Sequence, residues 1–301
     1  MKEIIEISND LSKPLVTSDI EWSLHLFKKR YKKQELYYEM YEVLINDLNL
    51  AYSDIFNNMN ANYLNVKDLK DYAPDMPKDT IGFIDIAKTS FLDLSQINLG
   101  IQKSNPFKGE LLKYNGYILE GRLNGESYIK VFFASNTVRT YRKRYYWATN
   151  EFSKIEKPML EIKDYADCII CNGYCLFFSN RAEGIFDLEK HYKAVAQKSL
   201  KFIQDLGIVD NFSEFYNYSS NYRQALKFDS FSEERLLEFS KLPINEKKKV
   251  IPSNLAINEE GQFVVTNKEQ LDATLDFICL KVFKDFNNDC YQTSYPKKII
   301  Q

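Results

Sequence analysis

The chain has 301 residues, of which 45% are hydrophobic and 27% charged, a composition typical of a globular protein with one large core or two smaller ones. With 40 Lys and Arg against 42 Asp and Glu, the formal net charge is −2, which excludes a general attraction to polyanions, so any nucleic-acid contact must come from local clusters. The first residues lack an apolar stretch of signal-peptide length, and no stretch approaches the roughly 18 apolar residues of a membrane span, so we expect a cytoplasmic protein.

The segment from Ser18 to Met59 carries apolar residues at helical spacing behind a Ser-x-x-Glu capping box. These residues are Ile20, Leu24, Phe27 and Tyr31, followed by Tyr38, Tyr41, Ile45 and Leu48. The sequence therefore predicts a helical pair or one bent helix over 18–59, within an N-terminal helical region over residues 1–75. The proline-containing stretch DYAPDMPK at 71–78 predicts a loop, which makes residues 76–301 a separate core domain.

After this loop the pattern changes to the period of two that is typical of strands. Strand-like stretches at 80–88, 116–123 and 126–134 are accompanied by Asn-Gly pairs at 115–116, 124–125 and 172–173. A two-residue Asn-Gly connection favours a tight hairpin, because both of its residues need positive φ. The spacing predicts an antiparallel meander rather than a parallel sheet with crossover helices.

Helical periodicity returns in the C-terminal part of the chain. We expect helices over 191–206 and 231–242, a short hairpin around Glu260-Gly261, and a helix that begins after an Asn267 cap. The predicted fold class is α+β, with an N-terminal helical region, a central antiparallel meander with Asn-Gly hairpins, and C-terminal helices packed on the sheet.

Three cysteines, Cys168, Cys171 and Cys175, have a spacing that suggests a metal or iron–sulfur site. If the Asn-Gly pair at 172–173 is a turn, Cys171 lies opposite Tyr174 and points away from the face that Cys168 and Cys175 share. Three thiolates then cannot converge on one ion. We expect buried structural cysteines and no metal or other cofactor.

The two histidines, His25 and His191, have no serine or cysteine motif beside them, so packing or surface roles are favoured over a catalytic triad.

One alternative chemistry remains. The tripeptide Glu161-Ile162-Lys163 resembles the E-x-K strand of Mg²⁺-dependent nucleases, with Glu120, Glu126 or Glu151 as candidates for the second acid. Its simpler interpretation is an exposed charged strand, and the sequence favours a non-enzymatic protein.

Clusters of basic residues give the better functional indication. Arg139, Arg142, Lys143 and Arg144 are interspersed with tyrosines and precede Trp147, and Lys28-Lys29-Arg30 with Lys32-Lys33 forms a second cluster. Cationic groups neutralise phosphates, and neighbouring rings can stack on bases. The simpler interpretation of either cluster is a solvated face.

The segment 167–193 resembles the core of the KwaB-like family of the Kiwa anti-phage system. The family has a strand, a tight turn, a second strand and a helix entry, and Glu183, Ile185 and Phe186 match that entry, although Ala182 stands at the usual Phe position. The resemblance covers about 111–300 and includes Thr293, Tyr295, Lys297 and Lys298.

The resemblance implies a cytosolic protein that binds DNA without strong sequence preference, self-associates, and works with a membrane-embedded partner subunit. We therefore favour a defence effector that acts by occupying DNA and lies at the inner membrane through its partner. Phosphates would contact Arg139, Arg142, Lys143 and Arg144, assisted by Lys28, Lys29 and Arg30. The alternatives are the nuclease, with Glu161 and Lys163, and a non-enzymatic adaptor that docks on a membrane protein or on anionic lipid.

Overall fold

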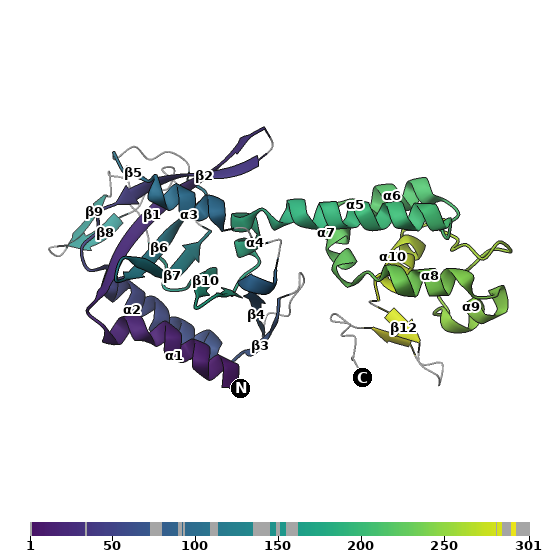
Figure 1. Cartoon of the computed structure of the whole chain (residues 1–301), viewed down its shortest axis with the longest axis horizontal. Helices are drawn as coiled ribbons and strands as arrows, with labels where there is room; N and C mark the ends of the chain where they lie inside the picture. The colour runs from purple at the N-terminus through teal and green to yellow at the C-terminus, as the bar shows by residue number, and fades with distance from the viewer. Residues whose placement is uncertain are drawn as a thin grey trace. The chain divides into compact units, whose positions relative to one another are not determined.

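The computed structural model of the chain divides into two compact units, residues 1–72 with 77–187 and residues 73–76 with 188–301 (Figure 1). Each unit has its own hydrophobic core. The residues that the structure describes are 2–33, 35–72, 80–89, 92, 94–108, 114–134, 145–148, 151–154, 162–280, 282–284 and 290–292. The predicted division into a helical region over 1–75 and a core domain over 76–301 stays a prediction.

The first unit is built on a sheet of nine strands in the order β3-β4-β11-β10-β7-β6-β1-β2-β5. All neighbours are antiparallel except the two outer pairs, β3–β4 and β2–β5. The strands are β1 (Ile20–Lys32), β2 (Glu35–Val43), β3 (Asp68–Asp71), β4 (Thr80–Asp85), β5 (Asn105–Pro106), β6 (Gly116–Leu123), β7 (Glu126–Phe133), β10 (Cys168–Cys171) and β11 (Tyr174–Phe177). The α+β class is thereby confirmed, as is the antiparallel meander from β6 to β11.

Four further strands form two small sheets outside this one. They are β8 (Tyr145–Ala148) with β9 (Glu151–Lys154), and β12 (Val282–Lys284) with β13 (Cys290–Gln292).

Two of the three predicted Asn-Gly turns are confirmed. Both residues have positive φ at 124–125, with 52° and 81°, and at 172–173, with 49° and 79°. The second turn pairs Cys171 with Tyr174, as predicted. The turn predicted at 115–116 is wrong, because Gly116 starts β6 opposite Phe27 and the Asn115 side chain accepts a hydrogen bond from the Lys29 N–H.

The cysteine arrangement follows from the same register. Cys168 and Cys175 share one face of the sheet with their sulfur atoms 3.2 Å apart, and both are fully buried. Cys171 faces the other side, where burial raises its thiol pKa to about 12. It therefore stays protonated at neutral pH.

The helix predicted over 18–59 is wrong in its first half, where β1 and β2 form a hairpin. The error has a physical reason. β1 lies inside the sheet between β2 and β6, and helices cover both faces of the sheet, so residues 24–28 are all buried. A strand buried on both faces loses the polar–apolar alternation, and its apolar residues can then match a helical spacing by chance.

Helices cover both faces of the sheet. α1 (Lys2–Val16) and α2 (Leu48–Met59) pack on the face that carries Leu24 and Leu119, while α3 (Ser95–Gln102) and α4 (Arg181–Phe186) lie on the opposite face (Figure 1). On that opposite face the Phe186 ring contacts Phe132 at 5.3 Å between ring centroids. The short helices η1 (Asn60–Leu64) and η2 (Ile86–Lys88) complete this unit.

The second unit is mainly helical. We expected its helices to pack on the sheet; their apolar side chains form a core of their own between residues 196 and 279. The helix predicted after Asn267 is confirmed, since the Asn267 side chain accepts from the Gln270 N–H at 2.9 Å. The helices are α5 (Leu188–Leu206), α6 (Phe212–Ser219), α7 (Tyr222–Ala225), η3 (Leu226–Ser230), α8 (Glu233–Lys241), α9 (Ile244–Val250) and α10 (Lys268–Ile278).

Gly116 shows how tightly the sheet is packed. A Cβ at this position would lie 2.2 Å from the Phe133 carbonyl oxygen and 2.7 Å from the Phe27 ring. We expect Gly116→Ala to lower the free energy of unfolding by about 2 to 3 kcal/mol, because backbone must move to relieve the overlap. Urea denaturation measures this change. Gly184→Ala is the control, since a Cβ there meets nothing within 4 Å. An unchanged stability in Gly116→Ala would contradict the packing described.

Candidate functional site

The predicted basic–aromatic cluster starts just before β8. Arg139, Arg142, Lys143 and Arg144 lie outside the described residues, so their role as phosphate contacts stays a prediction. The following strand, β8, pairs with β9 and places Trp147 opposite Phe152 in the backbone register.

Lys28 belongs to the second predicted cluster and is buried, with 5% of its surface exposed. Its ammonium group lies 5.3 Å from the centre of the Tyr41 ring and 5.0 Å from that of Tyr114. The rings stabilise the cation by cation–π attraction. In this placement the ammonium is not presented to a phosphate, so the prediction for Lys28 gains no support.

The two neighbours of Lys28 also have contacts within the protein. The Lys29 ammonium donates a hydrogen bond to the Gly184 carbonyl at 2.6 Å, and the Arg30 Nε donates to Glu39 at 3.0 Å. Side chains alternate between the two faces of a strand, so Lys29 points away from the face that Lys28 and Arg30 share. The three cations therefore do not form one surface, although Arg30 itself is exposed.

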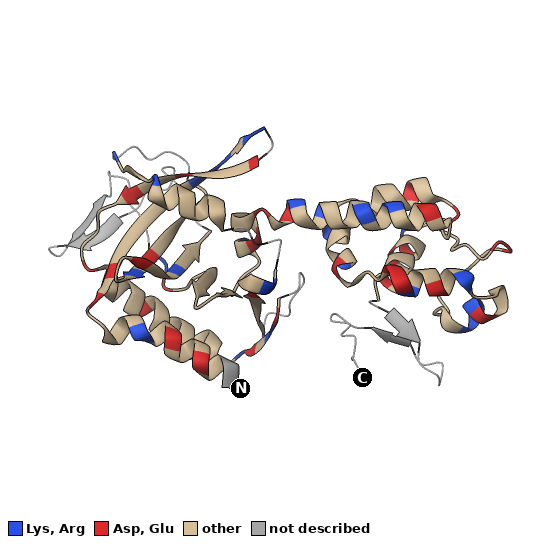
Figure 2. Ribbon diagram, in the orientation of Figure 1, with Lys and Arg blue, Asp and Glu red and all other residues tan. Residues whose placement is uncertain are grey.

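A basic surface does form farther along the same hairpin. β1 pairs with β2 as far as Lys32 but with β6 only over residues 20–27, so the hairpin continues past β6 as a two-stranded ribbon (Figure 1). Figure 2 shows basic and acidic residues at the free end of this ribbon. The exposed basic and aromatic side chains of this ribbon, named here the ribbon surface, are Arg30, Tyr31, Lys32, Lys33 and Tyr37. Arg30, Lys32 and Tyr37 share one face of the ribbon, and Tyr31 points to the other face.

The alternative nuclease site is described only in part. Glu161 lies outside the described residues, while the Lys163 N–H donates to the Tyr117 hydroxyl at 2.8 Å and its ammonium donates to the Ala134 carbonyl at 3.2 Å. Tyr117 and Glu120 are three residues apart on β6 and point to opposite faces of the sheet. The structure thus does not bring Lys163 together with Glu120, one of the acids that this alternative considered.

A polar cluster that the sequence did not predict lies on the sheet face opposite α1 and α2. The register aligns Ser23 of β1 with Glu120 of β6 and Lys130 of β7. Glu120 is 2% exposed and Lys130 8%. One Glu120 oxygen lies 3.4 Å from the Lys130 ammonium and the other 2.8 Å from Arg122 Nε. Burial lowers the pKa of Lys130, an effect that the nearby Glu120 carboxylate partly offsets.

His25 extends this polar cluster toward α3. Its ring nitrogens contact two hydroxyl groups, Nε2 with Ser23 at 2.9 Å and Nδ1 with Ser104 at 3.1 Å. Burial lowers the pKa of His25, so the imidazole is neutral at pH 7 and can donate to one serine and accept from the other. The cluster borders a cavity of about 480 Å³.

A buried histidine bonded to two serines is fully explained by the need to satisfy its ring nitrogens. The packing role predicted for His25 agrees with its burial. The sequence signal for the cluster was the alternation of the polar residues Glu21, Ser23 and His25. This alternation has no meaning when the segment is interpreted as a helix.

Taken together, these features define a two-unit α+β protein with a largely antiparallel sheet, an exposed ribbon surface and a buried polar cluster. Residues 113–285, more than half of the chain, match the model of the family described as Kiwa protein KwaB-like, and the chain belongs to this family. It is thus a component of the Kiwa anti-phage defence system, in which partner subunits are expected. No curated protein and no solved structure matches the chain.

Among the helices in the described part of the chain, none combines the length and the apolar character that crossing a bilayer requires.

Proposed function

We propose that this Kiwa component binds DNA with little sequence preference and acts by occupying it, without chemical change to the DNA. The observation that carries the proposal is the clustering of cations with aromatic rings, in a chain whose net charge is only −2. Such clusters bind the phosphate backbone, which is the same in every sequence, and the rings can stack on any base.

The ribbon surface supports the same proposal from the described residues. Arg30, Lys32 and Lys33 are exposed on a two-stranded ribbon, where Tyr37, 39% exposed, shares a face with Arg30 and Lys32 and Tyr31, 55% exposed, lies on the other face. A two-stranded β-ribbon has dimensions that the major groove of DNA admits. The nearby carboxylates of Glu35 and Glu39 reduce the positive charge, so we assign the ribbon surface a supporting part beside the cluster at 139–144.

The ribbon surface is tested by the triple variant Arg30→Ala, Lys32→Ala, Lys33→Ala. We expect its Kd for a DNA duplex to rise by about three- to tenfold at roughly 100 mM salt, because up to three phosphate contacts are lost. Fluorescence anisotropy with two labelled duplexes of unrelated sequence measures the affinity and its sequence dependence.

The matched control is Lys198→Ala, Lys201→Ala, Lys241→Ala, which removes three exposed lysines of the second unit. An unchanged Kd in the ribbon variant would remove the ribbon surface from the binding site. Failure of the wild-type chain to bind either duplex at low salt, or a large difference between the two, would end the proposal as a whole.

We further propose that the protein self-associates and acts in the cytoplasm, held at the inner membrane by a membrane-embedded subunit of the same system. Family membership supports the expectation of a partner subunit. Co-expression with the neighbouring Kiwa gene product and recovery of both proteins from the membrane fraction tests the membrane partner, and light scattering of the purified chain tests self-association.

A further inference from the structure

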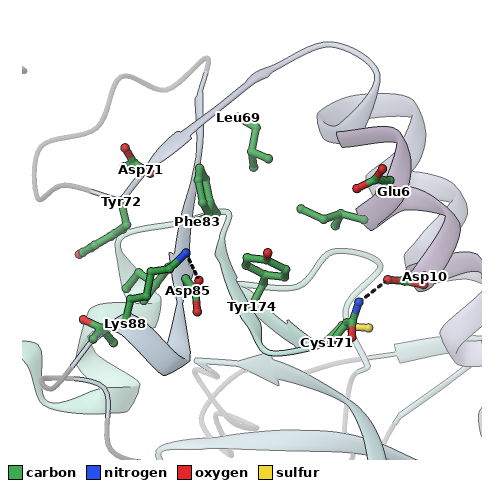
Figure 3. A pocket seen from close by; sticks show the side chains of 14 residues that line it. Glu6, Asp10, Leu69, Asp71, Tyr72, Phe83, Asp85, Lys88, Cys171 and Tyr174 are labelled. Carbon is green, nitrogen blue, oxygen red and sulfur yellow. Dashed lines mark hydrogen bonds and ion pairs between the residues drawn. The ribbon is translucent and has the colours of Figure 1, made fainter. Parts of the chain in front are cut away.

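A second cavity lies in the first unit, far from the ribbon surface in the sheet order, and has a volume of about 540 Å³. It is bounded by α1 and by the strands β3, β4, β10 and β11 (Figure 3). The register pairs Asp71 with Phe83 and Asp85 with Tyr174, so these side chains share the sheet face on which α1 packs. The cavity therefore lies at the border of the area of this sheet face that α1 covers.

Aromatic rings form part of its wall. The rings of Phe83 and Tyr174 are partly buried, 6.3 Å apart between centroids and inclined at 66°. Tyr72 also borders the cavity, with its ring against Phe177 at 4.3 Å between centroids and its hydroxyl donating a hydrogen bond to Glu183 at 2.6 Å. Ring faces attract cations and also provide apolar contact for an aliphatic chain.

The charges of the lining are mostly negative. Four carboxylates and one ammonium group, that of Lys88, surround the cavity. The carboxylates are those of Glu6, Asp10, Asp71 and Asp85. Lys88 lies 2.7 Å from Asp85 and holds the pKa of that carboxyl below its usual value, so Asp85 stays ionised. Asp10 pairs with Lys13 and accepts a hydrogen bond from the Asn172 side chain at 2.8 Å. With Lys13 and Lys88 both counted against the four carboxylates, the surroundings of the cavity keep a net negative charge, which favours a cationic occupant.

The position of the cavity indicates which cation fits. β3 is the outermost strand in the sheet order, and none of the strands that the structure describes pairs with its outer edge. An extended chain segment along such an edge adds to the sheet and directs alternate side chains to one face. Next to β3 that face holds Leu69 and Asp71, at the rim of the cavity.

We propose that this cavity binds a lysine or arginine side chain of an extended segment of a partner protein. The cationic head lies among the carboxylates, and the aliphatic stem packs against Phe83 and Tyr174. The carboxylates favour a ligand with a positive charge, and the rings favour an aliphatic stem next to that charge. The open edge of β3 favours a ligand that is part of a polypeptide. The site is separate from the DNA contacts proposed above and needs none of their residues.

The experiment uses the full chain and a fluorescein-labelled peptide of alternating lysine and threonine, with an alternating glutamate and threonine peptide as the control probe. Fluorescence anisotropy gives the Kd. We expect the double variant Glu6→Gln, Asp71→Asn to bind the lysine peptide about five- to tenfold more weakly, and Tyr174→Leu about threefold more weakly. Glu6 and Asp71 are exposed, so their substitution leaves the fold intact.

The matched control is Glu126→Gln, Glu259→Gln, which removes two exposed carboxylates elsewhere. Its Kd should equal that of the wild type. The proposal is overturned if the Glu6 and Asp71 variant loses no more affinity than this control, if the glutamate peptide binds equally well, or if free spermidine displaces the lysine peptide as readily as unlabelled peptide does. The last result would assign the cavity to a small free cation.

Discussion

Replacing Arg139, Arg142, Lys143 and Arg144 by alanine is expected to weaken DNA binding by more than about tenfold at roughly 100 mM salt. Each cation that contacts a phosphate releases about one counterion, so the loss of four contacts should also reduce the slope of log Kd against log salt by about 3 to 4. Anisotropy titrations of a labelled duplex at several salt concentrations measure both quantities.

This slope distinguishes a lost contact from a general loss of charge. The control replaces Lys193, Lys198, Lys201 and Lys241, four exposed lysines of the second unit, and should leave the slope nearly unchanged. If the variant at 139–144 keeps the affinity and the slope of the wild type, these four residues do not hold the phosphates. If both variants lose affinity equally, binding depends on overall charge and not on a defined site.

Glu120→Ala is expected to lower the free energy of unfolding by about 3 to 5 kcal/mol, because it leaves the buried Lys130 ammonium without its carboxylate. The value is large since Glu120 and Lys130 are 2% and 8% exposed, so both charges are largely removed from water. Urea denaturation followed by circular dichroism measures the change.

Two comparisons make this prediction specific. Glu126→Ala removes an exposed carboxylate of the neighbouring strand and should change stability by less than about 0.5 kcal/mol. The double variant Glu120→Leu, Lys130→Met removes both charges and should be markedly more stable than Glu120→Ala. Equal stability of Glu120→Ala and the wild type would show that the polar cluster is open to solvent.

Much of the fold could be predicted because the signals are local. An Asn-Gly turn needs positive φ at two adjacent residues, and this requirement identified the hairpins at 124–125 and 172–173 and the register of the second. A capping asparagine followed by periodic apolar residues likewise identified the helix after Asn267. These features depend on residues within a few positions of one another.

β1 could not be predicted in the same way. Its five consecutive buried residues, 24–28, reflect cover on both faces by elements distant in the sequence. With that strand misassigned, the alternation of Ser23 and His25 had no meaning, and the polar cluster with Glu120 and Lys130 was missed. The burial of Lys28 could not be predicted for the same reason, since only the tertiary structure places its ammonium group near the Tyr41 and Tyr114 rings.

By itself, the sequence determined the α+β class, the two tight hairpins, the capped C-terminal helix and the resemblance to the KwaB-like family. Only the tertiary structure decided which face each side chain of β1 occupies, which buried charges meet, and where α1 leaves an acidic, aromatic cavity open beside β3. The reason is physical: turns and caps are fixed by the backbone geometry of neighbouring residues, whereas burial and charge pairing arise between strands and helices that lie far apart along the chain.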